Sequence, residues 1–194
     1  MTLESKETKS DNPSKQGKGN SGNYWRFAAM IATAMAVMFV LMYVNTFAIE
    51  HVRWSETRFY MTFVMGAAMA GIMLSFMLGM YKNKMVNIGI FVASALVLIG
   101  SIWLVRSQAT VEDSSYMRAM IPHHSIAILT SERSNIEDVR VCELAVEIIE
   151  AQRREIAEMD WLIADIAENG AVETAVEAEN RPVPAFQGTA TRNC

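Results

Sequence analysis

Three long stretches without charge constrain this 194-residue chain more than any other feature. Phe27–Ile49, Phe59–Met80 and Val86–Val105 contain 23, 22 and 20 residues, and none of these is Asp, Glu, Lys or Arg. Because a helix rises about 1.5 Å per residue, roughly 20 apolar residues cross a hydrocarbon core of about 30 Å. The stretches therefore predict three transmembrane helices, and they exclude an ordinary soluble globule.

The residues that flank these stretches support the same interpretation. Tyr24 and Trp25 precede the first stretch and Trp103 lies near the end of the third, at the depths where amphipathic rings prefer to sit. The first stretch is long for the apolar part of a signal peptide, and a hydrophilic leader of 26 residues precedes it. We therefore expect an uncleaved anchor.

Basic residues in the short loops predict the orientation, because loops on the cytoplasmic side carry an excess of Lys and Arg. A cytoplasmic N-terminus places seven basic residues inside: Lys6, Lys9, Lys15, Lys18, Arg26, Lys82 and Lys84. It leaves four outside: Arg53, Arg58, Arg106 and Arg118. We therefore expect a protein of the cytoplasmic (inner) membrane whose C-terminal head, residues 106–194, is extracytoplasmic.

The composition of the residues outside the three stretches separates two polar tails from an acidic head. Residues 1–23 and 170–194 are rich in small and polar residues, and we expect both tails to be disordered. The head has eight arginines, no lysine and sixteen acidic residues, which argues against nucleic acid as a partner. Its two cysteines, Cys142 and Cys194, are too few for a disulfide framework or a thiolate cluster, and we expect Cys194 to be a free thiol.

Two helices are expected between these tails, in residues 110–169. The first begins near Thr110 and runs to about Arg133. The second begins at a capping-box pattern at Ser134 and ends at the pair Asn169–Gly170. A turn of two to four residues predicts an antiparallel hairpin, so the fold class is all-α: three transmembrane helices plus a two-helix hairpin. The second helix has an apolar face that repeats at helical spacing: Val141, Leu144, Ile148, Ala151, Met159, Leu162 and Ile166.

The residues of the hairpin that can bind a metal ion are sulfur and imidazole groups. Met120 precedes His123 by three residues and His124 by four, so it lies one helical turn below both. Met159 lies on the apolar face of the second helix and can face them. Thioether and imidazole donors suit Cu(I) or Ag(I), or Cu(II) through the imidazoles. The alternative is that one histidine packs inside, one is exposed, and the methionines belong to the core.

The hairpin sequence resembles the family called domain of unknown function 305, or DUF305. The resemblance rests on Met120-x-x-His123-His124 followed by Gln152-x-x-Glu155-Ile156-x-x-Met159, within about Asp113–Ile166. It implies a ferritin-like helical hairpin and, because several members are associated with copper tolerance, copper binding by Met120, His123, His124 and Met159. Leu129 and Thr130 stand where members usually carry a further methionine.

A second methionine pattern lies in the membrane segment. Met61, Met65, Met69, Met73 and Met77 recur every four residues on the second span. These thioethers either relay Cu(I) across the membrane or fill gaps in apolar packing, and we favour packing.

These observations predict a membrane-anchored, extracytoplasmic protein that binds a soft metal ion, with copper as Cu(I) favoured, for sequestration or tolerance. We expect no enzymatic activity, because no glutamate precedes either histidine at the spacing of di-iron sites. The expected partners are membrane lipid and a second copy of the chain, with the two hairpins forming a four-helix bundle. The alternative function is a structural or interaction module whose hairpin assembles without metal.

Overall fold

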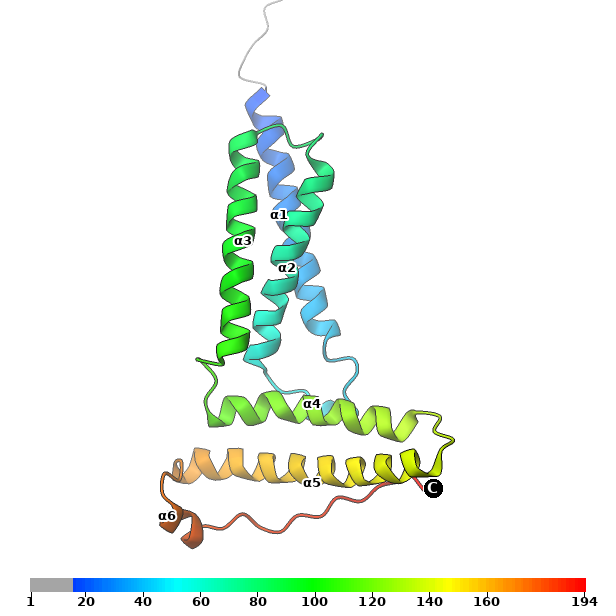
Figure 1. Ribbon diagram of the computed structural model, residues 1–194. Coiled ribbons are helices and arrows are strands. Elements are labelled where there is room, and N and C mark those ends of the chain that lie inside the picture. Colours follow the sequence, from blue (N-terminus) through cyan, green and yellow to red (C-terminus); the bar gives the residue numbers. More distant parts are fainter. Residues whose placement is uncertain (1–15) are drawn as a thin grey trace, which may run out of the picture.

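A computed structural model describes residues 16–194, and the side chains from Asn23 onward. Helices are the regular secondary structure of the described residues, which contain no strand, as predicted (Figure 1). Its elements are α1 (Gln16–Leu41), the 3-10 helix η2 (Ile49–His51), α2 (Glu56–Met77), α3 (Lys84–Ser107), α4 (Asp113–Arg133), α5 (Val139–Asn169) and α6 (Ala175–Asn180). Part of the predicted disordered N-terminal tail, residues 1–15, lies outside the described residues. The remainder is helical from Gln16, which corrects the prediction for that part of the tail.

The three predicted spans are three long apolar helices. Asn23–Leu41, Glu56–Met77 and Lys84–Ser107 are each long and apolar enough to cross a membrane. Helix α2 packs against both α1 and α3. Gly66 of α2 lies against the side chain of Met35 of α1, and a Cβ at position 66 would clash with it.

The methionines of the membrane segment take part in this packing. Phe27, Ile31, Leu74 and Tyr81 form a buried cluster between the helices. Met69, Met73 and Met77 of the methionine stripe pack against that cluster, together with Met35 of α1. This placement agrees with the packing interpretation of the stripe.

The first span is shorter than predicted. It was expected to run to Ile49, but α1 ends at Leu41 and a turn follows. Polar groups give this turn its own hydrogen bonds: the Thr46 hydroxyl donates to the carbonyl of Tyr43 (2.9 Å), and the Arg58 guanidinium donates to the carbonyl of Met42 (2.8 Å). Apolar composition alone could not reveal that these residues form a loop facing the head.

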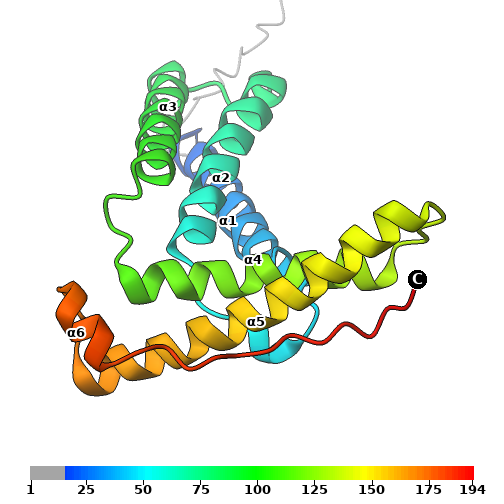
Figure 2. The same ribbon diagram turned by 60° about the horizontal axis from the view of Figure 1, so that its bottom comes forward.

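Helices α4 and α5 form the predicted hairpin, which lies across the ends of the membrane helices (Figures 1 and 2). Helix α5 begins one residue after Asp138, whose side chain caps it, rather than at the pattern around Ser134. It ends as predicted before Gly170, which adopts a positive φ of 81°. The hairpin core contains Met117, Ile121, Ile128, Ile156 and Met159.

The predicted apolar face of α5 was only partly correct. Met159 is buried, but Leu144 and Val141 remain 54% and 49% exposed. Cys142, Ala145 and Ile149 are buried in their place. The helical period was read correctly, but the buried face is rotated because part of it packs against a segment that follows α6.

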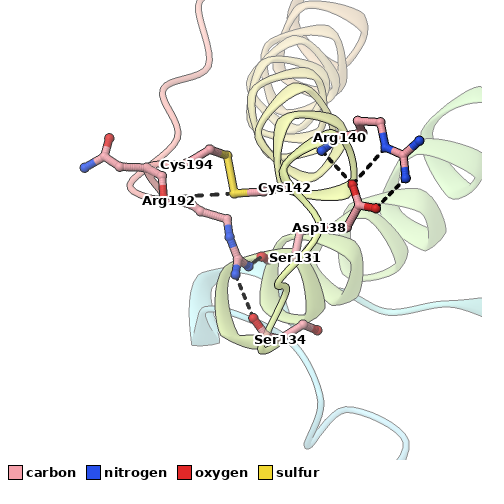
Figure 3. Close-up of a disulfide and its surroundings, with 8 residues drawn as sticks. Ser131, Ser134, Asp138, Arg140, Cys142, Arg192 and Cys194 are labelled. Atoms are coloured by element: carbon pink, nitrogen blue, oxygen red, sulfur yellow. Dashed lines mark hydrogen bonds and ion pairs between the residues drawn. A yellow bond between two sulfur atoms is a disulfide. The ribbon is translucent and has the colours of Figure 1, made fainter.

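That segment, residues 182–194, is here called the C-terminal strap, and it corrects the prediction of a disordered tail. It runs back along the hairpin in an extended path and ends at a disulfide between Cys142 and Cys194 (Figures 2 and 3). The prediction of a free Cys194 thiol was therefore wrong. A count of cysteines could not detect the bond, because the two residues are 52 positions apart and only the fold brings their Cα atoms to 5.8 Å.

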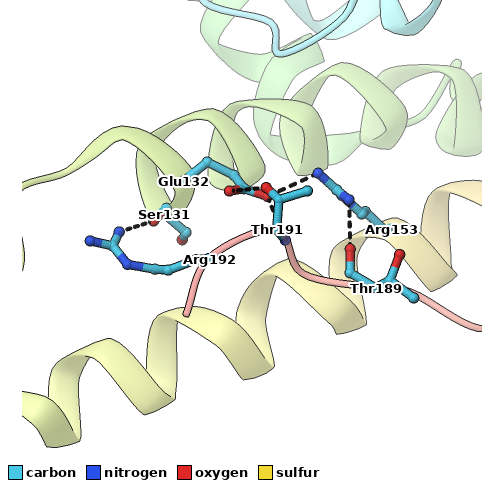
Figure 4. Close-up of polar contacts among 6 residues, drawn as sticks. All are labelled: Ser131, Glu132, Arg153, Thr189, Thr191 and Arg192. Atoms are coloured by element: carbon cyan, nitrogen blue, oxygen red, sulfur yellow. Dashed lines mark hydrogen bonds and ion pairs between the residues drawn. The ribbon is translucent and has the colours of Figure 1, made fainter. Parts of the chain in front are cut away.

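Polar contacts of residues 189–192 hold the end of the strap against the hairpin (Figure 4). The Arg153 guanidinium donates to the carbonyl of Thr189 at 2.5 Å, and the Thr191 hydroxyl donates to the Glu132 carboxylate at 2.5 Å. Arg192 donates to the backbone carbonyls of Ser131 and Ser134 at the end of α4. A cation that satisfies the unpaired carbonyls of a helix C-terminus is stabilising, so the strap also caps α4.

Candidate functional site

The candidate site is centred on His124, whose two ring nitrogens both have partners. Nδ1 lies 2.9 Å from the carbonyl oxygen of Met120, one turn earlier on α4. Nε2 lies 2.8 Å from a carboxylate oxygen of Glu155 on α5. A carbonyl oxygen and a carboxylate oxygen both accept hydrogen bonds, so each ring nitrogen faces an acceptor. The side chain of His124 is 12% exposed, and its orientation is set by contacts from both helices.

The pairing of His124 with Glu155 defines how the two helices face each other. In an antiparallel pair, a step of one turn backward on α4 corresponds to a step of one turn forward on α5. Met120 precedes His124 by four residues and Met159 follows Glu155 by four, so the two methionines occupy the next level of the interface. Met120 packs against the buried cluster that contains Met159. Helical spacing therefore puts Met120 and His124 on one side of α4, and Glu155 and Met159 on one side of α5.

His123 is placed differently from the other three predicted residues. It is exposed on α4, and its ring centroid lies 6.1 Å from that of His124. One residue step rotates a helix by about 100°, which turns His123 away from the α5 interface. The metal-free alternative predicted this same placement, with one histidine inside, one histidine exposed and the methionines in the core.

Glu155 is the residue that sequence reasoning missed. Glu155 was named from the sequence only as part of the family motif, yet its side chain is only 39% exposed and pairs with His124. A signal was present in the spacing, because Glu155 and Met159 are separated by four residues just as Met120 and His124 are. Carboxylates at helix surfaces are common, however, and only the register of the hairpin selects this one.

The donor chemistry of this site favours soft ions. Among residues 16–194, no group of three or more His, Cys, Asp or Glu side chains is placed to hold a metal ion, which is the kind of set that zinc normally uses. The set here consists of two thioethers, one imidazole and one carboxylate. Thioethers bind Cu(I) and Ag(I) in preference to harder ions, so these residues fit a soft ion.

Next to this site, a second polar contact joins the hairpin to the membrane segment. The hydroxyl of Ser125 is fully buried, accepts a hydrogen bond from the backbone N–H of Phe47 (2.7 Å), and lies 2.8 Å from Nδ1 of His51. The side chain of Phe47 packs against the hairpin core. Burial lowers the pKa of His51, and this effect exceeds the opposing one of the nearby Asp160 and Glu50 carboxylates. The loop before α2 is therefore part of the packing that covers the hairpin.

Fold and site together define a class: a helical hairpin with a histidine–glutamate pair and methionines in its core, joined to three membrane-length helices. Residues 106–192 match the family described as "Domain of unknown function (DUF305)", so this part of the chain is a DUF305 domain, in agreement with the resemblance noted above.

A curated relative matches more of the chain than this domain. The "Uncharacterized protein L153" of Acanthamoeba polyphaga mimivirus is 29% identical over 145 residues, which cover 70% of this chain and 91% of that protein. No solved structure matches the chain.

Proposed function

We propose that this protein is a membrane-anchored, extracytoplasmic protein that binds a soft metal ion, most favourably Cu(I), in sequestration or tolerance. The observation that carries the proposal is the contact between His124 of α4 and Glu155 of α5, beside which Met120 packs against the cluster that contains Met159. Met120, His124 and Met159 would hold the ion, with Glu155 beside them and the exposed His123 as a further ligand. The ion is the cargo of the protein, and no reaction step is attributed to it.

The existing hydrogen bonds suit this role for His124. Its Nδ1 donates to the carbonyl of Met120, which fixes the ring and leaves Nε2 as the ligand atom. A metal ion at Nε2 replaces the proton that otherwise binds Glu155. Metal and proton therefore compete for one nitrogen, and binding should strengthen as the pH rises through the imidazole reference value of about 6.5.

The disulfide supports an extracytoplasmic head. Disulfides persist in oxidising compartments outside the cytosol, and Cys142–Cys194 links the two ends of the α5–strap segment. The distribution of Lys and Arg around the spans favours the same orientation. These two arguments are independent, since one rests on redox chemistry and the other on loop charge.

The second candidate function is a structural or interaction module that binds no metal. It is favoured by the complete hydrogen bonding of the His124 ring and by the burial of Met159 in the hydrophobic core. An exposed apolar stripe on α5, formed by Val141, Leu144 and the partly buried Ile148, provides a surface on which a second copy would pack.

Titration of the full-length protein in detergent with Ag(I) and with Cu(I) in a competing chelator tests the proposal. We expect one ion per chain, bound more tightly at about pH 7.5 than at about pH 5.5 because imidazole must be neutral to ligate. His123→Ala combined with His124→Ala should abolish binding. Met120→Leu and Met159→Leu should weaken the soft ions far more than Cu(II).

Met117→Leu is the matched control, since Met117 is buried in the same cluster but lies seven residues before His124, about two helical turns away. Met-to-Leu exchanges in a core usually cost under about 1.5 kcal/mol, so all three leucine variants should remain helical. If the parent protein binds no soft ion, or if Met117→Leu weakens binding as much as Met120→Leu, the metal proposal is wrong and the interaction module stands.

A further inference from the structure

A pocket lies at the turn between α2 and α3, at the end of the membrane helices far from the hairpin (Figure 1). Its volume is about 530 Å³, within the range of roughly 300–1,000 Å³ that is usual for small-molecule sites. The pocket is lined by Leu78, Tyr81, Lys82, Lys84, Asn87, Ile88 and Phe91. None of these residues belongs to the candidate site in the hairpin.

The polar and apolar residues of this pocket lie at different depths. Lys82 and Lys84 are exposed at the turn, and Lys84 is the first residue of α3. Ile88 and Phe91 follow Lys84 by four and seven residues, so they lie about 6 and 10 Å further along the helix axis. Since α3 spans the membrane, the lysines are at the level of the lipid headgroups and the apolar walls reach into the hydrocarbon.

Hydrogen bonds within the turn hold the walls of the pocket in place. The Asn87 amide donates to the carbonyl of Tyr81 at 2.7 Å, and its oxygen accepts from the Tyr24 hydroxyl at 2.8 Å. The Asn83 side chain accepts from the backbone N–H groups of Met85 and Val86, which caps α3. Tyr81 and Asn87 are 4% and 7% exposed, so the pocket does not need to be formed by its ligand.

The charge of the pocket selects its occupant. Both basic side chains are on its rim, no acidic residue lines it, and within residues 23–194 neither lysine takes part in an ion pair. We propose that this pocket binds one anionic phospholipid, with the phosphate between Lys82 and Lys84 and an acyl chain along Leu78, Ile88 and Phe91. Basic pockets between membrane helices bind anionic headgroups in this way.

Native mass spectrometry of the full-length protein in detergent tests this assignment, with phosphatidylglycerol and phosphatidylcholine of identical acyl chains as the two probes. We expect phosphatidylglycerol to be retained in preference. A basic residue at the membrane surface contributes about 1 kcal/mol to binding of anionic lipid, so Lys82→Gln with Lys84→Gln should weaken retention about 30-fold. Ile88→Trp fills the apolar part and should reduce the retention of phosphatidylglycerol.

Arg106→Gln is the matched control, because Arg106 is an exposed basic residue at the other end of α3. It should leave the lipid preference unchanged. Equal retention of the two lipids by the parent protein, or an equal effect of Arg106→Gln and the lysine variant, overturns the proposal. Glycerol 3-phosphate is a further probe: if it displaces the lipid at equal concentration, the site recognises a free phosphate and the lipid assignment is wrong.

Discussion

The disulfide between Cys142 and Cys194 leads to a quantitative prediction. The bond closes a loop with a sequence separation of 52 residues, which includes most of α5, all of α6 and the C-terminal strap. In the chain-entropy description, a loop of this length stabilises the folded state by about 4 kcal/mol, because it restricts the unfolded chain. Cys194→Ala should therefore reduce the free energy of unfolding of the head by up to that amount.

Hydrogen exchange in increasing urea measures this loss specifically in the head, since peptides from α4 and α5 are distinguished from those of the membrane helices. Unfolding of a small domain usually has a urea dependence of about 1–3 kcal/mol per molar, so the midpoint should fall by about 1–4 M. The membrane helices should be unaffected. Addition of a reductant to the parent protein should reproduce the effect, and it should change nothing further in Cys194→Ala.

Gly188→Ala provides a second perturbation of the same segment without removal of the bond. Gly188 packs so closely against the backbone carbonyl of Glu150 that an added Cβ would clash with it. Backbone atoms cannot move aside as a flexible side chain can, so the strap should lift from α5 and the α5 amides beneath it should exchange faster. If both variants leave exchange and the urea midpoint of the head unchanged, the strap does not stabilise the hairpin and the reasoning is refuted.

Three further predictions concern topology, pH and assembly. Cys142→Ala frees the Cys194 thiol, which should react with a membrane-impermeant maleimide on intact cells or spheroplasts. The parent protein should react only after reduction, because both of its cysteines are in the disulfide. Labelling of the variant only after lysis would reverse the proposed orientation. The pKa of His51 is lowered in the folded protein, so protonation of His51 favours the unfolded state. The contribution of the neutral His51 ring to the free energy of unfolding is therefore complete above the reference pKa of about 6.5, and it is lost as the pH falls through the pKa of the folded state. Thermal unfolding at about pH 7.5 and about pH 5 should therefore show a larger loss for the parent than for His51→Asn, and equal losses would contradict this role. Ile148→Asp should dissociate the proposed homodimer while Ile148→Leu should not, because only the charge is costly in an apolar contact; a parent protein that is monomeric by light scattering would exclude the dimer.

Local patterns in the sequence were sufficient to locate the five long helices, although not the end of α1 or the start of α5, and to find part of the site. Absence of charge over about 20 residues identifies a span whatever its neighbours are, and helical spacing placed Met120 and His124 on one side of α4. The stop at Gly170 followed from the same kind of local rule, since glycine adopts a positive φ without strain. Each of these features depends on residues that are close together in the chain.

Only the tertiary structure decided the features that join distant residues. The choice of Glu155 as the partner of His124 depends on how α4 and α5 are aligned, and several other glutamates of α5 have the same local chemistry. The strap, the disulfide and the loop around Phe47 bury surfaces of the hairpin that its own two helices leave uncovered. Periodicity shows that a helix has an apolar face, but it does not show what covers that face, because burial depends on contacts between segments far apart in the sequence.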